Sequence, residues 1–508
     1  MHGLLERNAA IVTSPRGFLA LIATTLALLA LIRAFLFPGV GGDDGEQLVF
    51  SQFFDWGYQL RNPPLVTWLL IGLQELTGPT VFSIVLLRGL ALFAVYALSF
   101  GVALELLGER RIAALSAGSL LMIFQVGWNT IHGFTHTTFV TAFYLAALYL
   151  VLRLGRAPSV WGRVLFGAVL GFGLMAKYSF ALFALALVIA ALFERDLRRA
   201  ILSPWVALGV ALSLPVVVLQ LTWLVEQAPS HYLVRSEVPL SLGENALRIL
   251  KTLLRVCLSV VGFVMPFAVL RLAVFWRAVR SRPKPEGERA ARLRFLERML
   301  MIIAIAAFGA IAIIQADRPR SHYLFVLVPF VPYLFLRFGA AFTAVQIRRY
   351  AALVTLSAVV LVTALVTKYF VEPLICGHCE DHVPYDSFAR QLRDAGFKGG
   401  TIFAYFHKEP LAGNLRVRFP HDRIVSAKHP KAIPPKRQPP GQCLVVWPVK
   451  GSVEPKSATV RGANESPLAT KLPYDYPSRV ITAPLSPWGK RPQQLEFLIV
   501  EGGAGGCR

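Results

Sequence analysis

Long apolar segments, separated by short and often basic loops, occupy most of this 508-residue chain, up to about residue 370. An α-helix needs about 20 mainly apolar residues to cross the hydrocarbon core of a bilayer, so we predict about 11 membrane-spanning helices. The expected spans are 17–37, 80–107, 112–130, 134–153, 162–177, 178–193, 202–224, 250–275, 299–316, 322–342 and 350–370, and 162–193 can be divided in more than one way. The first span ends without a convincing small-residue cleavage site, so we interpret it as a retained anchor and not as a signal peptide.

The pattern changes after about residue 371, where the apolar runs become shorter and Pro, Gly and Lys become more frequent. We therefore expect a transmembrane domain over 1–370 and a small α/β domain over 371–508. In the second domain the pattern predicts a helix near 385–395, strands near 400–406, 442–448 and 494–500, and a Pro-rich connection over 429–441.

Composition agrees with a polytopic α-helical membrane protein. Hydrophobic residues make up 55% of the chain and charged residues only 16%, and the mean hydropathy is +0.56, which excludes an ordinary soluble protein. The formal net charge of +23 needs no nucleic-acid partner, because the basic residues cluster in short loops on one side of the alternating spans. These residues are Arg7, Arg16, Arg110, Arg111, Arg153, Arg156, Arg163, Arg195, Arg198, Arg199, Arg348 and Arg349, with the basic segment 276–298. The positive-inside rule places this side and the N-terminus in the cytoplasm, and everything after about residue 371 outside.

The opposite side of the membrane collects the residues that are capable of chemistry. Asp43 and Asp44 lie just past the first span, at the start of an outer loop over 38–79 that also carries many aromatic side chains. A charge at the bilayer boundary is costly unless it faces a polar cavity, so this pair indicates a functional site, with an ordinary solvated loop as the alternative. The other outer loops contribute Trp128, Asn129, His132 and His136, then Lys177 and Tyr178, then Glu226, His231, Tyr232, Arg235 and Glu237, and finally the segment 317–323. Such asymmetry favours a reaction centre at the outer face over a channel.

Several of these residues have simpler interpretations. Lys177 can extend from a helix end to the interface, and the arginines of 317–323 can anchor lipid headgroups. His132 and His136 have the i, i+4 spacing of metal ligands, but no third ligand accompanies them in the sequence. The pair Asp43 and Asp44 can also hold a divalent cation together with phosphate oxygens.

Three motifs resemble the dolichyl-phosphate-mannose–protein mannosyltransferase superfamily, which includes the lipid A aminoarabinose transferases and consists of membrane glycosyltransferases of the GT-C type. The first outer loop is similar to the family's acidic and aromatic motif; its matching residues are Asp43-Asp44, Phe50-Ser51-Gln52, Gly57-Tyr58, Asn62-Pro63-Pro64-Leu65 and Trp68. The Gly-rich segment 167–179 and the run Ser321-His322-Tyr323-Leu324 resemble two later motifs. The chain departs from the family at three positions: Asp44 replaces the usual Glu, Asn62 replaces a His, and His136 replaces an Asp.

The resemblance implies a GT-C fold and a monosaccharide donor linked to polyprenyl phosphate. Asp43 is then the general base or acceptor-orienting carboxylate, and its neighbour Asp44 raises the proton affinity of the pair. Displacement by one activated acceptor inverts the anomeric centre. The residues expected to bind the donor phosphate are Lys177, Arg318, Arg320, His322 and Tyr323, and the candidates for the substrate pocket are Tyr58, Asn62, His132, His136 and Arg235.

The resemblance also implies where the enzyme acts and with what partners. The site lies at the outer face of a bacterial inner membrane, with the C-terminal domain in the periplasm. The acceptor is lipid A, a polysaccharide or a protein, membrane lipids surround the spans, and no cofactor is expected apart from a divalent cation at the acidic pair. The acidic loop, the lysine turn and the arginine-histidine loop are expected to meet in one pocket. Two other functions stay open: another enzyme of lipid-linked sugars, such as a polysaccharide polymerase, and a secondary transporter, although no internal repeat supports the transporter.

Four of the five cysteines, Cys376, Cys379, Cys443 and Cys507, lie on the outer, oxidising side. We predict structural disulfides there, with the connectivity left open. Zinc binding and redox chemistry are the alternatives for the pair Cys376 and Cys379. Cys257 falls within an expected span and is predicted to be an inert core thiol.

Overall fold

The structure is a computed structural model, and it divides the chain into two compact units. Unit 1 contains residues 1–28, 60–65 and 88–362, and unit 2 contains 29–59, 66–87 and 363–508. The residues that the structure describes are 2–228, 242–281, 286–313, 321–338, 342–376, 379–404, 410–429, 432–436, 441–449, 477–489 and 492–500. The expected domain boundary near residue 370 stays a prediction.

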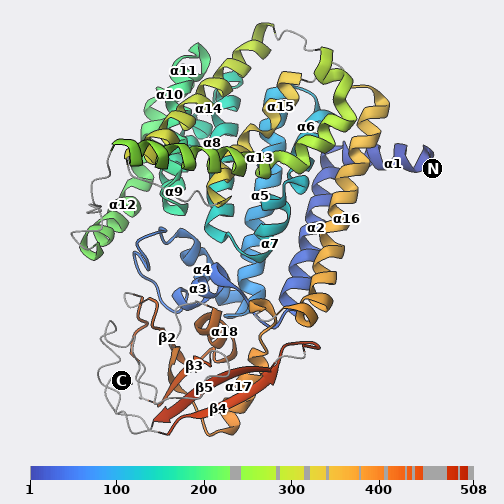
Figure 1. The fold of residues 1–508 in the computed structure, drawn as a ribbon. Helices are drawn as coiled ribbons and strands as arrows, with labels where there is room; N and C mark the ends of the chain where they lie inside the picture. Colours follow the sequence, from blue (N-terminus) through green and yellow to red (C-terminus); the bar gives the residue numbers. More distant parts are fainter. Residues whose placement is uncertain are drawn as a thin grey trace. The chain divides into compact units, whose positions relative to one another are not determined.

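Unit 1 is almost entirely helical (Figure 1). Its elements are α1 (His2–Val12), the start of α2 (Pro15–Phe35), most of α5 (Val81–Leu107), α6 (Arg110–Gly118), η1 (Ser119–Met122), the π-helix η2 (Gln125–Asn129), α7 (Thr130–His132), α8 (Thr135–Arg156), α9 (Val160–Ala176), α10 (Phe180–Leu192), α11 (Arg195–Ile201), α12 (Pro204–Gln227), α13 (Leu242–Ser281), α14 (Gly287–Ile313), η3 (Ser321–Phe330), α15 (Val331–Phe338) and most of α16 (Ala344–Ile375).

The predicted polytopic helical fold is confirmed, but the described helices are less uniform than the expected spans. Six of them are long and apolar enough to cross a membrane: Pro15–Phe35, Val81–Leu107, Thr135–Arg156, Pro204–Gln227, Glu244–Trp276 and Ala344–Ile375. A seventh is added if Arg110–Met122 and Gln125–His132, which meet at a bend of 72°, count as one span. The expected spans 162–177, 178–193 and 322–342 correspond to shorter apolar helices. The expected span 299–316 falls in α14, which begins earlier, at Gly287.

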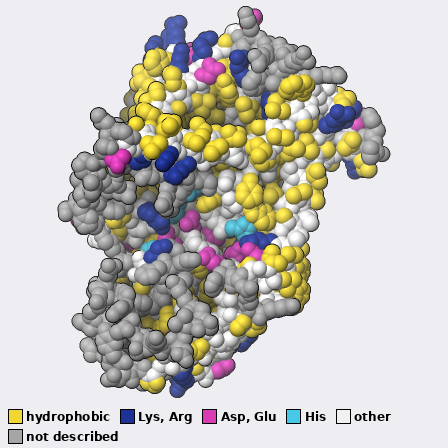
Figure 2. Space-filling model, in the orientation of Figure 1, with side chains coloured by type: hydrophobic (Ala, Val, Ile, Leu, Met, Phe, Trp, Pro, Cys, Tyr) yellow, Lys and Arg dark blue, Asp and Glu magenta, His cyan; other side chains and the backbone are white. Residues whose placement is uncertain are grey.

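Exposed apolar side chains cover the long helices. Along α13, for example, Leu250, Leu254 and Leu258 are all at least 60% exposed. Figure 2 shows hydrophobic side chains spread over the helices of unit 1, as expected where lipid tails replace water. Cys257 is a free thiol and is exposed on this surface, so its prediction as a core residue is wrong. The reason is that α13 presents its apolar side chains outward.

The basic loops of unit 1 gather at one end of its helices. Glu105, at the end of α5, accepts hydrogen bonds from Arg153 and Arg156 at the end of α8, at 3.5 and 3.2 Å. Arg292 of α14 donates to the nearby Leu106 carbonyl at 2.9 Å. Loops that are distant in sequence therefore share one basic end, the arrangement on which the charge-based topology depends.

Unit 2 contains a five-stranded mixed sheet in the order β2-β1-β3-β5-β4. The strands are β1 (Gly400–Ala404), β2 (Arg423–Ser426), β3 (Gln442–Pro448), β4 (Arg479–Pro484) and β5 (Pro492–Val500), and the helices are α3 (Gly42–Phe50), most of α4 (Leu65–Thr77), α17 (Tyr385–Asp394) and α18 (Pro410–Arg418). β1 pairs in parallel with β2 and β3, whereas β5 pairs antiparallel with β3 and β4. The predicted helix near 385–395 and the three predicted strands are confirmed, and α18, β2 and β4 were not predicted.

The core of unit 2 joins the C-terminal domain to the first outer loop. Phe388, Ile402 and Leu444 are completely buried in one cluster with Phe50 and Val49 of α3. The acidic loop is therefore part of the hydrophobic core of this domain. Each large apolar side chain that is buried there contributes about 1.5–3 kcal/mol to the stability of the fold.

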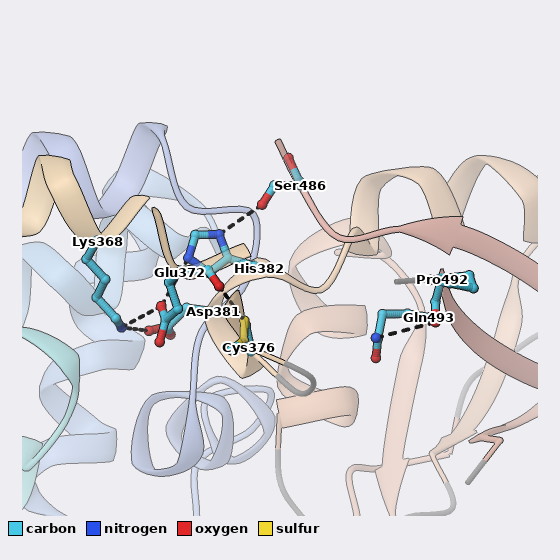
Figure 3. Close-up of a disulfide and its surroundings, with 9 residues drawn as sticks. Lys368, Glu372, Cys376, Asp381, His382, Ser486, Pro492 and Gln493 are labelled. Carbon is cyan, nitrogen blue, oxygen red and sulfur yellow. Dashed lines mark hydrogen bonds and ion pairs between the residues drawn. A yellow bond between two sulfur atoms is a disulfide. The ribbon is translucent and has the colours of Figure 1, made fainter. Parts of the chain in front are cut away.

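A charged network fastens the end of α16 to the C-terminal domain (Figure 3). Asp381 accepts hydrogen bonds from the fully buried Arg33 at 2.7 Å and from Lys368 at 2.6 Å. The His382 ring lies 3.1 Å from Glu372 and 2.9 Å from the Ser486 carbonyl oxygen. Within this network the predicted disulfide is confirmed for Cys376 and Cys379. Cys443 is also disulfide-bonded, and Cys507 lies outside the described residues.

Candidate active site

The acidic pair lies in the first turn of the short helix α3. Carboxylates are stabilised there by the unpaired N–H groups and the dipole of the helix N-terminus. The two side chains have different environments: Asp43 is exposed, whereas Asp44 is completely buried. Of the acidic residues on α3, only Asp43 is therefore open to an incoming substrate.

Close backbone contact holds α3 against α18. A Cβ atom at Gly413 would overlap the backbone of Gly45, so only glycine allows the two helices to approach this closely. Next to it, the Asn414 side chain accepts from the Val40 N–H at 3.0 Å and donates to the Val40 carbonyl at 2.9 Å. The position of the acidic turn is therefore set by the C-terminal domain.

A third carboxylate, Glu46, lies one turn after Asp43 and is 2% exposed. It accepts a hydrogen bond from Gln59 Nε2 at 2.7 Å, and His429 Nε2 lies 3.4 Å from its other oxygen. The His429 ring in turn packs edge-on against Phe50. From the sequence, Glu46 counted among the carboxylates of the first outer loop but was given no role, and His429 and Asn414 were missed. The only available signal was the position of Glu46, three residues after Asp43.

The aromatic part of the first outer loop is rigid. Tyr58 is 2% exposed, and its hydroxyl donates to the Phe53 carbonyl at 2.7 Å and accepts from the Asp55 N–H at 2.9 Å. Burial raises the pKa of Asp55 above its ordinary value, although the backbone N–H groups of Trp56 and Gly57 oppose the shift. Burial likewise raises the pKa of Tyr58, so its hydroxyl keeps its proton at neutral pH. Tyr58 holds the loop in shape, and its predicted contact with substrate stays a prediction.

The lysine turn follows α9 in unit 1. The backbone of Lys177 is extended, which ends the helix, and its Nζ donates to Thr137 Oγ1 at 2.9 Å. The glycines before it pack against α12: a Cβ at Gly167 would overlap the backbone of Val206, and one at Gly171 would overlap the Ser213 side chain. Small residues that allow such backbone contact are typical of helix pairs in membranes. The Gly-rich motif therefore places Lys177 by packing, and the lysine supplies the charge.

The lysine turn and the start of η3 come together in unit 1. Lys177 Nζ lies 6.0 Å from the centre of the Tyr323 ring, and this ring is 54% exposed. His322 lies against Tyr323 and, on its other side, against Phe134, with ring centres 4.5 and 5.9 Å apart. Two of the three segments that were expected to share a pocket are thus adjacent.

An irregular backbone separates the two histidine candidates. Phe134 has a left-handed conformation with φ of 60°, between His132 and the start of α8. This is rare for a residue other than glycine and costs of order 1–3 kcal/mol, and such strain is concentrated at functional sites. His136 is 4% exposed with its Nδ1 3.4 Å from the Ala176 carbonyl, and His132 packs edge-on against Trp128. Within the described parts of the chain, no group of three or more His, Cys, Asp or Glu side chains is arranged to hold a metal ion.

Four further residues were predicted for the site. Arg235, Arg318 and Arg320 lie outside the described residues. Asn62 is half-buried and belongs to unit 1, whereas the acidic helix belongs to unit 2. A single pocket shared by all three segments stays a prediction.

Known proteins share both the sequence pattern and the fold. A model of the dolichyl-phosphate-mannose-protein mannosyltransferase family matches residues 61–223. Two lipopolysaccharide core galacturonosyltransferases of Rhizobium johnstonii, RgtA and RgtB, are 26% and 28% identical to this chain; each alignment covers 84% of it, and 85% and 86% of the relatives. The crystal structure of ArnT from Cupriavidus metallidurans bound to undecaprenyl phosphate aligns over 95% of this chain and 98% of its own, with a TM-score of 0.58 and 16% identity. Its apo state gives a TM-score of 0.56.

The chain has a GT-C-type fold and is similar in sequence to membrane glycosyltransferases. The resemblance to the mannosyltransferase and aminoarabinose transferase superfamily is thereby confirmed. The family match covers the bent helix and the lysine turn of this chain but begins after the acidic helix. The alignments with RgtA, RgtB and ArnT extend over most of the chain, and the small C-terminal domain is part of the fold shared with ArnT.

Proposed function

We propose that this glycosyltransferase moves a monosaccharide from a polyprenyl-phosphate donor to a glycolipid acceptor at the outer face of a bacterial inner membrane. The N-terminus then lies in the cytoplasm and the C-terminal domain in the periplasm. The observation that carries the proposal is the contrast on α3, where Asp43 is exposed while Asp44 and Glu46 are buried. A base must reach the acceptor, and only Asp43 of these three is open to it.

The proposed reaction is one displacement at the anomeric carbon of the sugar. Asp43 takes the proton of the acceptor hydroxyl as the acceptor oxygen forms its bond to this carbon. The bond between the carbon and the phosphate oxygen breaks on the opposite face, and polyprenyl phosphate leaves with the electron pair. The configuration is inverted, and a phosphate is a good enough leaving group to need charge stabilisation rather than a strong acid.

Lys177 is the proposed partner of the departing phosphate. Its Nζ donates to the neutral Thr137 hydroxyl at 2.9 Å and lies 6.0 Å from the centre of the exposed Tyr323 ring, so Tyr323 and His322 can add further contacts to the same oxygens. We assign Arg318 and Arg320 to the same task, because the guanidinium group suits bidentate contact with phosphate. Undecaprenyl phosphate bound to the structurally similar ArnT supports a donor of this class.

The similarity to RgtA and RgtB supports a choice of acceptor and sugar. Because RgtA and RgtB are lipopolysaccharide core galacturonosyltransferases, we favour the lipopolysaccharide core among the possible acceptors and galacturonic acid as the first sugar to test.

Replacing Asp43 by Asn tests the proposal. Removal of a general base typically costs about 10²- to 10⁴-fold in rate, so we expect Asp43→Asn to lose transfer from radiolabelled polyprenyl-phosphate sugar to lipopolysaccharide. The purified variant should keep the melting temperature of the native protein, because Asp43 is exposed. The matched control is Glu75→Gln, which removes an exposed carboxylate from α4 and should leave the rate unchanged. Full activity of Asp43→Asn would disprove the base assignment.

A chelator distinguishes the base from a cation ligand. The proposed base needs no metal, so transfer should continue in excess EDTA. Loss of activity that Mg²⁺ or Mn²⁺ restores would instead assign Asp43 and Asp44 to a divalent cation.

A further inference from the structure

Unit 2 contains an open hollow of about 770 Å³ that is separate from the acidic helix. It lies where α2 and α4 end and α5 begins, beside α17 and α18, and no residue of α3 lines it. Its volume is within the range of about 300–1,000 Å³ that is typical of small-ligand sites. The hollow is large enough for a specific ligand, and nothing in the proposed reaction uses it.

One wall of the hollow is cationic, formed by Arg390 and Arg393 of α17 and Arg418 of α18. The charge of Arg418 is already compensated, because its guanidinium group lies 3.1 Å from Asp386 and also donates to the Pro38 carbonyl. The two arginines of α17 are both exposed. Arg393 donates to the Arg418 carbonyl at 2.7 Å, which leaves its charge uncompensated. For Arg390, no hydrogen bond or ion pair is present among the described residues. The carboxylate that lines the hollow, Asp386, is paired with Arg418, and the charges of Arg390 and Arg393 have no carboxylate partner among the described residues.

Other lining residues of the hollow are apolar. Phe35, the last residue of α2, is 72% exposed, and its ring lies 6.1 Å from that of Phe82 near the start of α5. Leu36 adds a further 39% exposed apolar side chain. Because α2 and α5 are both candidate membrane spans, their ends mark the level where the hydrocarbon core gives way to headgroups. The hollow therefore combines a cationic wall with apolar helix ends at the bilayer edge.

We propose that this hollow binds an anionic diacyl phospholipid of the surrounding membrane. Its phosphate contacts Arg390 and Arg393, and its acyl chains lie along the exposed sides of α2 and α5. Guanidinium groups bind phosphate in bidentate fashion, and basic pockets beside membrane helices recognise anionic headgroups. Thr77 and Thr80 also line the hollow. The Thr77 hydroxyl donates to the Leu73 carbonyl at 3.0 Å and can accept from the glycerol part of the headgroup, whereas the Thr80 hydroxyl accepts from the Ser83 N–H at 3.2 Å and can donate to it. The bound lipid attaches the C-terminal domain to the bilayer surface next to the catalytic loop.

Native mass spectrometry of the full chain in detergent, titrated with phosphatidylglycerol, tests this site. We expect one tightly retained phosphatidylglycerol on the native protein, and binding about tenfold weaker or worse in the double variant Arg390→Gln/Arg393→Gln, since each such cation contributes a factor of a few. Arg390→Gln alone, which removes no contact within the described residues, should weaken binding by several fold without lowering the melting temperature. The matched control Lys398→Gln/Lys436→Gln removes the same charge from exposed positions outside the hollow and should bind like the native protein.

Two further ligands test which parts of the phospholipid the hollow recognises. Phosphatidylcholine with the same acyl chains should bind much more weakly, because its net charge is zero, and glycerol 3-phosphate should bind weakly because it has no acyl chains. The proposal is overturned if phosphatidylcholine binds equally well, if glycerol 3-phosphate binds as tightly as the lipid, or if the control variant loses as much affinity as the double variant. A measured preference for a phosphorylated glycolipid over phosphatidylglycerol would overturn it as well.

Discussion

The acidic helix and the lysine turn are held in place by opposite means. The acidic helix α3 has backbone contact with α18 and an amide clamp from Asn414, and its core residues are buried with the sheet domain. The Lys177 amine donates to the Thr137 hydroxyl, and the lysine lies at the end of a helix that is positioned by its glycines. The difference fits the two tasks that we propose for Asp43 and Lys177. A general base must be placed to within a fraction of an ångström, whereas an ammonium group acts on phosphate as an adaptable point charge.

Among the changes that test how the two segments are held, the largest effect should come from Gly413→Ala, which separates α3 from α18. The added methyl group overlaps the Gly45 backbone, so we expect a loss of about 1–3 kcal/mol in the free energy of unfolding. The shifted helix should also lower transfer by about a hundredfold, because small misplacements of catalytic groups are costly. Thermal unfolding and the transfer assay measure the two effects.

The control for this change is Gly72→Ala in α4, where an added Cβ meets no atom within 4 Å. Alanine is favoured over glycine in a helix by about 1 kcal/mol, so this variant should be at least as stable as the native protein. Equal behaviour of Gly413→Ala and Gly72→Ala would show that the contact between α3 and α18 does not position the base.

Lys177→Met should have the next largest effect. It should lower kcat/KM for the donor without lowering the stability of the protein. Loss of a charge-assisted hydrogen bond costs about 1.5–3 kcal/mol, which corresponds to roughly a 10- to 100-fold loss of kcat/KM for the polyprenyl-phosphate donor. The activity of the native enzyme should fall with added salt more steeply than that of the variant. An unchanged kcat/KM would remove Lys177 from the phosphate site.

Thr137→Val should have the smallest effect of the three. It keeps the shape of the side chain but removes the hydroxyl that holds Lys177, and one neutral partner contributes about 0.5–1.5 kcal/mol. We therefore expect a few-fold rise in the KM for the donor with kcat nearly unchanged. In the double variant with Lys177→Met the threonine change should add nothing, because the two groups act through one contact. Full additivity would contradict that coupling.

Hydrophobic periodicity and charge along the chain predicted those elements whose own residues show a clear pattern. The apolar spans, the basic loops, α17 and three of the strands follow from hydrophobic period and charge. The short strands β2 (Arg423–Ser426) and β4 (Arg479–Pro484) were missed, because four to six residues carry little pattern and their stability comes from pairing with neighbours. The bend within 110–132 was also missed, since hydropathy measures how apolar a segment is and not whether it is straight.

The sequence by itself determined that this chain is a polytopic helical membrane protein and that an acidic pair follows the first span, and it predicts that the reactive side chains gather on one side. These properties depend on composition and on neighbours along the chain. Only the tertiary structure decided which carboxylate is open to substrate and what holds it there. Val40 and Asn414 are 374 residues apart in sequence, and a contact of that kind exists only once the C-terminal sheet has folded around the first outer loop.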